Sequence, residues 1–266
     1  MTSKLTAYIE GIGLIGPGLN DWASGSQVLA GLQPYLSAKT VIPVPELLPA
    51  AERRRASDIV KLTLATSLEA LSQAALADSN LPSVFSFSNG DGLNCHSICE
   101  MLASEDREIS PTRFHNSVHN AAAGYWSIAT KTMATSSVLC AFDASFGAGL
   151  LDALTQVVVE GTACILMASD TPYPEPMFSK RPIPDNSGIA LVLAAEKSKQ
   201  SIAQITVSIT HEPADKFDDA ALENLRTSLP SMRGLPLLQL IASQQHGLVV
   251  LDYLDGLRLA VEVRSC

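Results

Sequence analysis

The sequence predicts an α/β fold in which helices cover a mostly buried sheet. Short apolar segments, typical of buried strands, alternate along the chain with segments whose apolar residues recur at three- and four-residue steps, as in helices. Apolar residues make up 47% of the 266 residues, so the chain can bury a substantial core. This length suits one large domain or two small ones.

The expected elements follow from apolar periodicity and from the placement of glycine and proline. Strands are predicted over residues 5–9, 84–88, 137–142, 162–168, 188–195, 205–210, 248–251 and 257–263. Helices are predicted over residues 50–76, 93–103, 121–131, 147–161 and 236–244. A glycine-rich turn is expected over 11–18, and irregular chain over 38–50 and 171–186, where prolines gather.

The charge pattern excludes some classes of function. The net charge is −9 and the pI about 5.0, whereas nucleic-acid binding needs a basic face. The one basic run, Arg53 to Arg55, is typical of a solvated face and could also receive an acidic carrier protein. Charged residues make up 17% of the chain, against about 25% for an average soluble protein. This deficit favours a surface partly covered by a partner, although a compact α/β enzyme would also fit.

The sequence predicts no membrane span, metal site or cofactor. No apolar run reaches the roughly 18 residues that a span needs, and a cytoplasmic protein is expected. The five cysteines show no disulfide framework, and Cys140 and Cys164 are expected in the core. Cys95 and Cys99 share a helix face, but without a second ligand pair they are interpreted as buried packing residues and not as zinc ligands.

Residues 11–16 (GIGLIG) fit a dinucleotide-binding fingerprint by letter. That fingerprint requires the glycine turn to run directly into a helix, and Pro17 and Gly18 follow here instead. A tight corner after the first strand is therefore the preferred interpretation, and a nucleotide-binding α/β domain is kept as an alternative.

A polar segment over residues 113–120 carries two histidines. If it is a strand, His115 and His119 share one face with Ser117, which would suit either acid–base chemistry or an edge lining an interface.

Residues 137–154 (SVLCAFDASFGAGLLDAL) are typical of a strand, a sharp turn and a helix, the form of a nucleophile elbow. The turn is expected at Ser145, Phe146 and Gly147. Ser145 lacks the Gly-x-Ser-x-Gly frame, and no histidine can be assigned to it from the sequence, but a serine enzyme remains an alternative.

Together these segments resemble the N-terminal half of a β-ketoacyl synthase over about residues 5–195. The resemblance is carried by residues 7–18 (AYIEGIGLIGPG), 52–70 (ERRRASDIVKLTLATSLEA), 114–124 (FHNSVHNAAAG) and 137–154. It implies a thiolase-like layered fold with a truncated second half. Residues 1–195 would form the main unit of a single domain, and residues 196–266 would form a reduced C-terminal portion.

The chain departs from that family in two ways. The nucleophilic cysteine is missing, and its place is expected at Phe146 or Gly147. The histidine-bearing segments of the family's second half are also absent, and His211 and His246 lack matching surroundings. The resemblance is therefore to a chain length factor, a ketosynthase homologue that has lost its cysteine, in a short form similar to the partner subunits of aryl-polyene synthases.

The resemblance implies heterodimerisation with an active β-ketoacyl synthase and only indirect contact with the acyl carrier protein. The interface and substrate tunnel would be lined by a set drawn from two segments: Phe114, His115, Asn116, Ser117, Val118, His119, Asn120 and Phe146. Two rivals on the same fold stay open. One is an active acyltransferase that uses Ser145 or Cys140, and the other is a purely structural ketosynthase scaffold.

Overall fold

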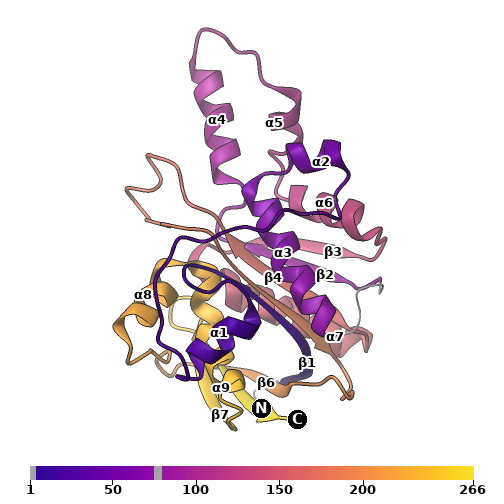
Figure 1. Cartoon of the computed structure of the whole chain (residues 1–266), viewed down its shortest axis with the longest axis vertical. Coiled ribbons are helices and arrows are strands. Elements are labelled where there is room, and N and C mark those ends of the chain that lie inside the picture. The colour runs from indigo at the N-terminus through magenta and orange to yellow at the C-terminus, as the bar shows by residue number, and fades with distance from the viewer. Residues whose placement is uncertain (1–3, 75–79) are drawn as a thin grey trace.

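The computed structural model describes residues 4–74 and 80–266, whose strands form one eight-stranded sheet (Figure 1). The strands are β1 (Leu5–Ile15), β2 (Ser83–Phe87), β3 (Ser136–Cys140), β4 (Cys164–Asp170), β5 (Ser187–Ala194), β6 (Ala203–Thr210), β7 (Gly247–Asp252) and β8 (Arg258–Ser265). Their order is β3-β2-β4-β5-β1-β6-β8-β7. The three strands at one end, β3, β2 and β4, run parallel, and all other neighbours are antiparallel. All the predicted strands are confirmed, with shifted ends.

The helices are α1 (Trp22–Leu29), α2 (Ala50–Arg55), α3 (Asp58–Gln73), α4 (Gly92–Ala103), α5 (Pro111–His115), α6 (Ala121–Thr130), α7 (Ser145–Glu160), α8 (Ala220–Ser228) and α9 (Leu235–Ala242), with short 3-10 helices η1 (Phe142–Ala144) and η2 (Pro230–Gly234). The helix predicted over 50–76 is two helices, because Ala56 adopts an extended conformation between α2 and α3. Residues 75 and 76 of that prediction lie outside the described residues.

Helices α3 and α7 cover opposite faces of the sheet, and β4 shows how the two cores divide. Ile165 and Met167 pack with the core on the α3 side, whereas Leu166 and Ala168 pack with the core that contains α7. All four side chains are fully buried. This continuous burial is expected for a strand covered on both faces.

The glycine corner predicted after residue 9 is wrong, because β1 continues through Ile15. Gly11 and Gly13 face α3, whose backbone presses directly on the strand. A Cβ atom on Gly11 would lie 2.0 Å from the carbonyl oxygen of Ala70, and one on Gly13 would lie 1.8 Å from that of Thr66. The glycines therefore permit close packing of a helix on a strand. The glycine turn that would hold a pyrophosphate is not formed.

Glu69 anchors α3 to the first strand and the first helix. Its carboxylate accepts hydrogen bonds from the backbone N–H of Leu14 at 3.0 Å and from that of Trp22 at 2.6 Å. Burial raises the pKa of this carboxyl, while the two backbone donors oppose the shift. One side chain thereby sets the position of three elements.

The C-terminal portion continues the same sheet. Strands β6, β8 and β7 extend it beyond β1, and β7 and β8 form the predicted hairpin, whose turn contains Gly256 at φ 74°. The division of the domain near residue 195 stays a prediction, but strands from both sides of that position share one sheet.

Helices α4 and α5 stand away from the sheet at one end of the molecule (Figure 1). Along α4, only Gly92 and Asn94 are buried. Cys95 and Cys99 are exposed on this helix, so the prediction that they are packed core residues is wrong. Among the described residues, no group of three or more His, Cys, Asp or Glu side chains could hold a metal ion.

Within the described ranges, one helical stretch, Phe142–Glu160, is long and apolar enough to cross a membrane by length and composition. Core helices of soluble proteins can have the same length and apolar composition. Here Leu150, Leu154 and Val157 are fully buried in the main core, so the stretch has the packing of a core helix.

Candidate functional site

The sharp corner between β3 and α7 lies at Phe142. The strand ends at Cys140, and Phe142 follows with φ 52°, a left-handed conformation that is uncommon for a bulky residue. A strained residue directly after a strand and before a helix is the geometry of a nucleophile elbow. The structure therefore forms an elbow, and the residue at its corner is an aromatic without a nucleophilic atom.

This position corrects the sequence prediction, which placed the corner at Ser145, Phe146 and Gly147. All three lie in the first turn of α7 and are buried. The Phe146 ring is 1% exposed, and a Cβ atom on Gly234 would lie 2.3 Å from it, so it is a core residue packed on η2. The predicted strand over 137–142 extended through Phe142, so the corner residue was counted as part of the strand.

Ser145 has a structural role at this corner. Its hydroxyl lies 2.6 Å from the carbonyl oxygen of Phe142 and 2.7 Å from that of Phe87, and it accepts from the N–H of Ala141 at 3.3 Å. Ser86 in turn donates to the Ser145 carbonyl at 2.6 Å. Ser145 as a residue is 1% exposed, and the contacts of its hydroxyl in the described structure include no imidazole. It ties β2 to the corner and lacks the partner that activates a serine nucleophile.

Cys140 contacts a histidine, which the sequence did not predict. Its sulfur lies 3.4 Å from Nδ1 of His119, and the residue is exposed at the end of β3, not in the core as predicted. Although the residue as a whole is exposed, its sulfur is partly shielded from water, which raises the pKa of this thiol, and the Asp170 carboxylate raises it further. Both effects disfavour the thiolate that nucleophilic chemistry requires.

Phe142 itself faces a small cavity. Its side chain is 51% exposed, and it lines a space of about 330 Å³ together with residues of the loop over 171–186. The other lining residues are Tyr173, Pro176, Met177, Lys180 and Arg181. Apolar atoms of Phe142, Pro176 and Met177 at this opening suit contact with an apolar ligand.

The segment over 113–120 is helix and turn, so the condition under which His115, Ser117 and His119 would share one strand face is not met. Pro111 occupies the first turn of α5, a favoured position for proline, and the chain then turns through Asn116 to the start of α6. Asn116 is buried, where its amide donates to the carbonyl of Arg55 at 2.9 Å and Tyr125 donates to its side-chain oxygen at 3.3 Å. The remaining site residues of this segment are exposed: Phe114, His115, Ser117, Val118, His119 and Asn120.

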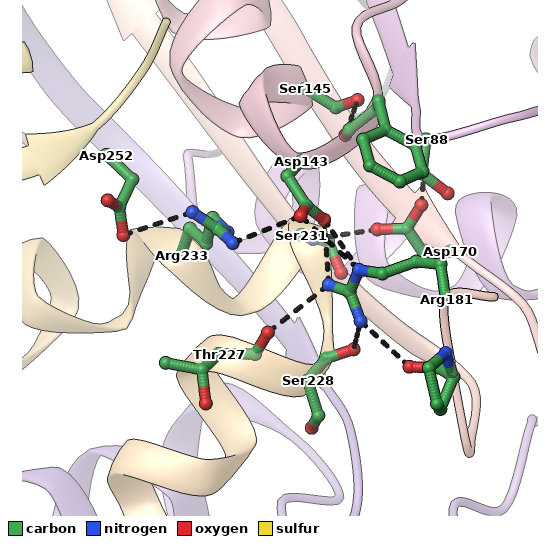
Figure 2. Close-up of polar contacts among 12 residues, drawn as sticks. Ser88, Asp143, Ser145, Asp170, Arg181, Thr227, Ser228, Ser231, Arg233 and Asp252 are labelled. Atoms are coloured by element: carbon green, nitrogen blue, oxygen red, sulfur yellow. Dashed lines mark hydrogen bonds and ion pairs between the residues drawn. The ribbon is translucent and has the colours of Figure 1, made fainter. Parts of the chain in front are cut away.

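An ionic cluster beside the corner was also missed from sequence (Figure 2). The guanidinium of Arg181 forms a forked contact with Asp143, with Nη2 and Nε at 2.7 and 3.0 Å from Oδ1. The same group donates to the carbonyls of Ser228 at 3.0 Å and Thr227 at 3.2 Å. The loop that holds Arg181 is thereby fixed to the corner and to the end of α8.

A second arginine continues the cluster into the C-terminal portion. Arg233 lies 3.4 Å from Asp143 and 3.3 Å from Asp252, and Figure 2 shows it between the two carboxylates. Asp252 also pairs with Arg226, which binds Glu223 at 2.6 Å. The corner is thus joined by charge to η2, α8 and β7.

Asp170 holds the back of the corner. It is fully buried, and its two oxygens accept from the N–H of Ser88 at 2.8 Å and of Ser231 at 2.7 Å (Figure 2). Burial raises the pKa of this carboxyl, and the hydrogen bonds oppose the shift. Asp170 therefore connects the ends of β2 and β4 to η2.

The Asp143 cluster leads to a stability prediction. Asp143→Ala leaves Arg181 and Arg233 without a shared carboxylate in a partly buried site, and we expect a loss of about 1–3 kcal/mol of unfolding free energy. Chemical denaturation measures the loss. Glu262→Ala, which breaks the exposed Arg264–Glu262 pair, is the matched control and should cost clearly less than Asp143→Ala, because solvent screens an exposed pair. Equal losses for the two variants would show that the cluster does not hold the corner.

The fold, together with an elbow whose corner residue has no nucleophilic atom, defines a ketosynthase-like domain. The family described as beta-ketoacyl synthase, N-terminal domain, matches residues 22–252, and the chain belongs to this family. The resemblance and the thiolase-like fold predicted from sequence are confirmed. None of the curated proteins compared with the chain matches it.

Solved structures with the same fold include two-subunit ketosynthase assemblies. A ketosynthase (ApeO) in complex with its chain length factor (ApeC) from Xenorhabdus doucetiae matches with 21% identity and a TM-score of 0.71, over 97% of this chain and 99% of that one. The ishigamide ketosynthase/chain length factor matches with 16% identity and a TM-score of 0.72, over 98% and 99%.

A larger relative shows the difference in length. A beta-ketoacyl synthase from Burkholderia phymatum matches with 13% identity and a TM-score of 0.59, over 92% of this chain and 71% of its own. The first two structures are covered almost completely, so this chain has the reduced length of their matched subunits.

Proposed function

We propose that this chain is a non-catalytic ketosynthase-like subunit, a chain length factor. It heterodimerises with an active β-ketoacyl-ACP synthase and shapes the acyl or polyene tunnel during type II polyketide or fatty-acid-like chain extension. The observation that carries the proposal is Phe142 at the corner of an intact elbow. Phenylalanine cannot form the thioester that a ketosynthase nucleophile forms with its acyl chain.

The remaining candidate nucleophiles support a non-catalytic role. Ser145 is buried, and its hydroxyl contacts the backbone carbonyls of Phe87 and Phe142. The pKa of the Cys140 thiol is raised, which disfavours its thiolate. The elbow thus keeps its backbone shape while its chemistry is absent.

A partner surface is supported by the sheet edge formed by β3 and by exposed apolar side chains on the chain between α5 and the Phe142 corner. Among the strands of the described residues, β3 has a neighbour on one side only, so its other side presents backbone groups that pair with none of these strands. Phe114 is 67% exposed and Met133 is 91% exposed, and Val118, Ile128 and Phe142 are exposed as well. We propose that the active ketosynthase covers this edge, in an obligate interface of roughly 2,000 Å² or more.

The tunnel wall is proposed at Phe142, in place of Phe146. The Phe142 ring and the cavity beside it lie where an elbow presents its reacting residue, so an acyl chain that crosses the interface from the ketosynthase would meet this ring. The ring would then limit the length of the acyl chain by steric exclusion.

The carrier protein contact is proposed to be indirect, through the ketosynthase. One solved structure, AntDE:AntF, is described as a type II PKS acyl-carrier protein in complex with its ketosynthase bound to the hexaketide. A chain of that structure matches this one with 11% identity and a TM-score of 0.73, over 99% of this chain and 100% of that one. A cytoplasmic location and an aryl-polyene product belong to the same proposal.

The contact between Cys140 and His119 favours a second candidate, an acyltransferase with Cys140 as nucleophile. A thiol 3.4 Å from an imidazole nitrogen has the partner that activates cysteine enzymes. The raised pKa of Cys140 counts against this candidate.

One experiment tests both candidates. The tagged chain is co-expressed with ketosynthases from the same source, purified, and its complexes are exposed to acyl carrier protein thioester before intact-mass analysis. We expect a one-to-one complex in which only the ketosynthase gains the acyl mass. An acyl adduct on this chain that disappears in Cys140→Ser would establish the second candidate, and failure to form any ketosynthase complex would contradict the first.

A further inference from the structure

The cleft beside the projecting helices has the chemistry of an anion site. It has a volume of about 860 Å³, within the size range of small-molecule sites, and lies between the arm formed by α4 and α5, the start of α3 and the loop over 171–186. Four cations, Lys39, Arg54, Arg55 and Arg113, and three carboxylates, Asp58, Asp91 and Asp185, are among the residues that line it. This cleft is separate from the Phe142 corner, since the two sets of lining residues do not overlap.

Three cations in the cleft have no counter-ion in the part of the chain that the structure describes. Arg55 pairs with Glu52 at 3.2 Å, whereas Lys39, Arg54 and Arg113 form no ion pair there. The charged side chains of the lining sum to a net charge of +1 in a protein whose net charge is −9, so the potential in this cleft favours an anion more than the rest of the surface does.

The acidic residues of the cleft are engaged elsewhere. Asp58 pairs with Lys61 at 3.1 Å. Asp185 accepts from the backbone N–H of Asn186 at 2.8 Å, and Asp91 accepts from the N–H of Asn94 at 2.9 Å. Asp91 and Asp185 keep their negative charge, but neither forms an ion pair with the three cations in the described part of the chain.

The start of α3 adds backbone donors to the same cleft. Ser57 is its N-cap residue but makes no side-chain capping bond, and Ser57, Asp58 and Ile59 all line the cleft. The first N–H groups of a helix have no partner within it, and they favour a bound anion.

The other walls are suited to an uncharged body. Ile59, Leu93, Pro172 and Pro184 supply apolar surface, while Ser110 and Thr112 supply hydroxyl groups. The two guanidinium groups and the ammonium can donate hydrogen bonds to the oxygens of a phosphate monoester, and a guanidinium fork can contact two of these oxygens at once.

We propose that this cleft binds an organic phosphate, with the phosphate held by Arg54, Arg113 and Lys39 at the start of α3, and the uncharged body against the apolar wall. The cleft does not include the Phe142 corner, but Arg113 and Asn116 come from the segment that also carries Phe114 of the proposed partner surface, so binding is compared with and without the ketosynthase.

Isothermal titration of the purified full chain, together with its ketosynthase where the two copurify, tests the site. The probes are AMP, coenzyme A and inorganic phosphate, with adenosine as the unphosphorylated control. We expect AMP or coenzyme A to bind at least tenfold more tightly than adenosine, and the binding to weaken with added salt.

Variants locate the binding. Arg54→Glu and Arg113→Glu should each weaken it at least tenfold, whereas Arg264→Glu, the same charge change at an exposed arginine on β8, should leave it unchanged. Circular dichroism confirms that the variants are folded, and Arg54→Ala and Arg113→Ala replace any that are not. Binding that is equal for AMP and adenosine, binding unchanged in the arginine variants, or no binding of any phosphate probe would overturn the proposal.

Discussion

Gly13→Ala is expected to abolish stable folding of this chain, or to lower its unfolding free energy by more than about 3 kcal/mol. A Cβ atom at this position would lie 1.8 Å from the carbonyl oxygen of Thr66, on the backbone of α3. Ordinary overpacking of a core costs about 1–3 kcal/mol, because side chains can move aside. Here the obstacle is helix backbone, so α3 itself must move away from β1.

Displacing α3 would also break the contacts that depend on its position. Glu69 on this helix accepts from the backbone of Leu14, next to Gly13, and its hydrogen bond to Trp22 holds α1. The loss therefore extends to three elements, and we expect the variant to be insoluble or to melt well below the natural protein in thermal denaturation.

Gly124→Ala is the matched control. Gly124 lies inside α6, and a Cβ atom added there would meet no heavy atom within 4 Å. Alanine is favoured over glycine in a helix by about 1 kcal/mol, so this variant should be as stable as the natural protein or slightly more stable. A Gly13→Ala variant as stable as Gly124→Ala would show that α3 does not press on β1 as described.

The same glycines show why part of the fold could not be predicted from sequence. Alternation of apolar segments identified every strand of the sheet, because buried strands and helices impose different periods. The glycines were assigned to a turn, since a turn is where glycine most often occurs. Their true role depends on Thr66 and Ala70, which are distant in sequence and have no marker there.

The candidate site was located to the right segment and the wrong residue. The strand and helix around residues 137–154 were recognisable, but small residues near Ser145 were taken for the turn, when they form the first turn of α7. A left-handed conformation is usually indicated in a sequence by glycine, and this position holds Phe142 instead. The supporting cluster joins Asp143, Arg181, Arg233 and Asp252, and pairing at such separations cannot be deduced from one sequence.

Phe142→Ala is expected to lengthen the product made by the assembled ketosynthase complex. Removing the ring enlarges the cavity against Met177 and Pro176, and the growing chain gains room there. Discrimination against one extra methylene in an apolar pocket is worth about 1–3 kcal/mol, or about 10–200-fold. We therefore expect the ratio of longer to original product to rise at least about tenfold, as measured by mass spectrometry of extracted products.

Phe142→Trp should have the opposite effect, because a larger ring leaves less room beside the loop. Phe142→Gly should lengthen the product as alanine does and should also relieve the left-handed backbone strain, so that it is about 1 kcal/mol more stable than Phe142→Ala. This difference separates the effect on backbone strain from the effect on the cavity.

Phe146→Leu provides the control for position. Phe146 is buried in the core against Gly234, so the substitution should lower stability while product length stays unchanged. If Phe146→Leu changed product length and the Phe142 variants did not, with every complex intact, the tunnel wall would lie at the residue that the sequence indicated. If neither position changed product length, the chain would act as a scaffold for the ketosynthase without contacting the acyl chain.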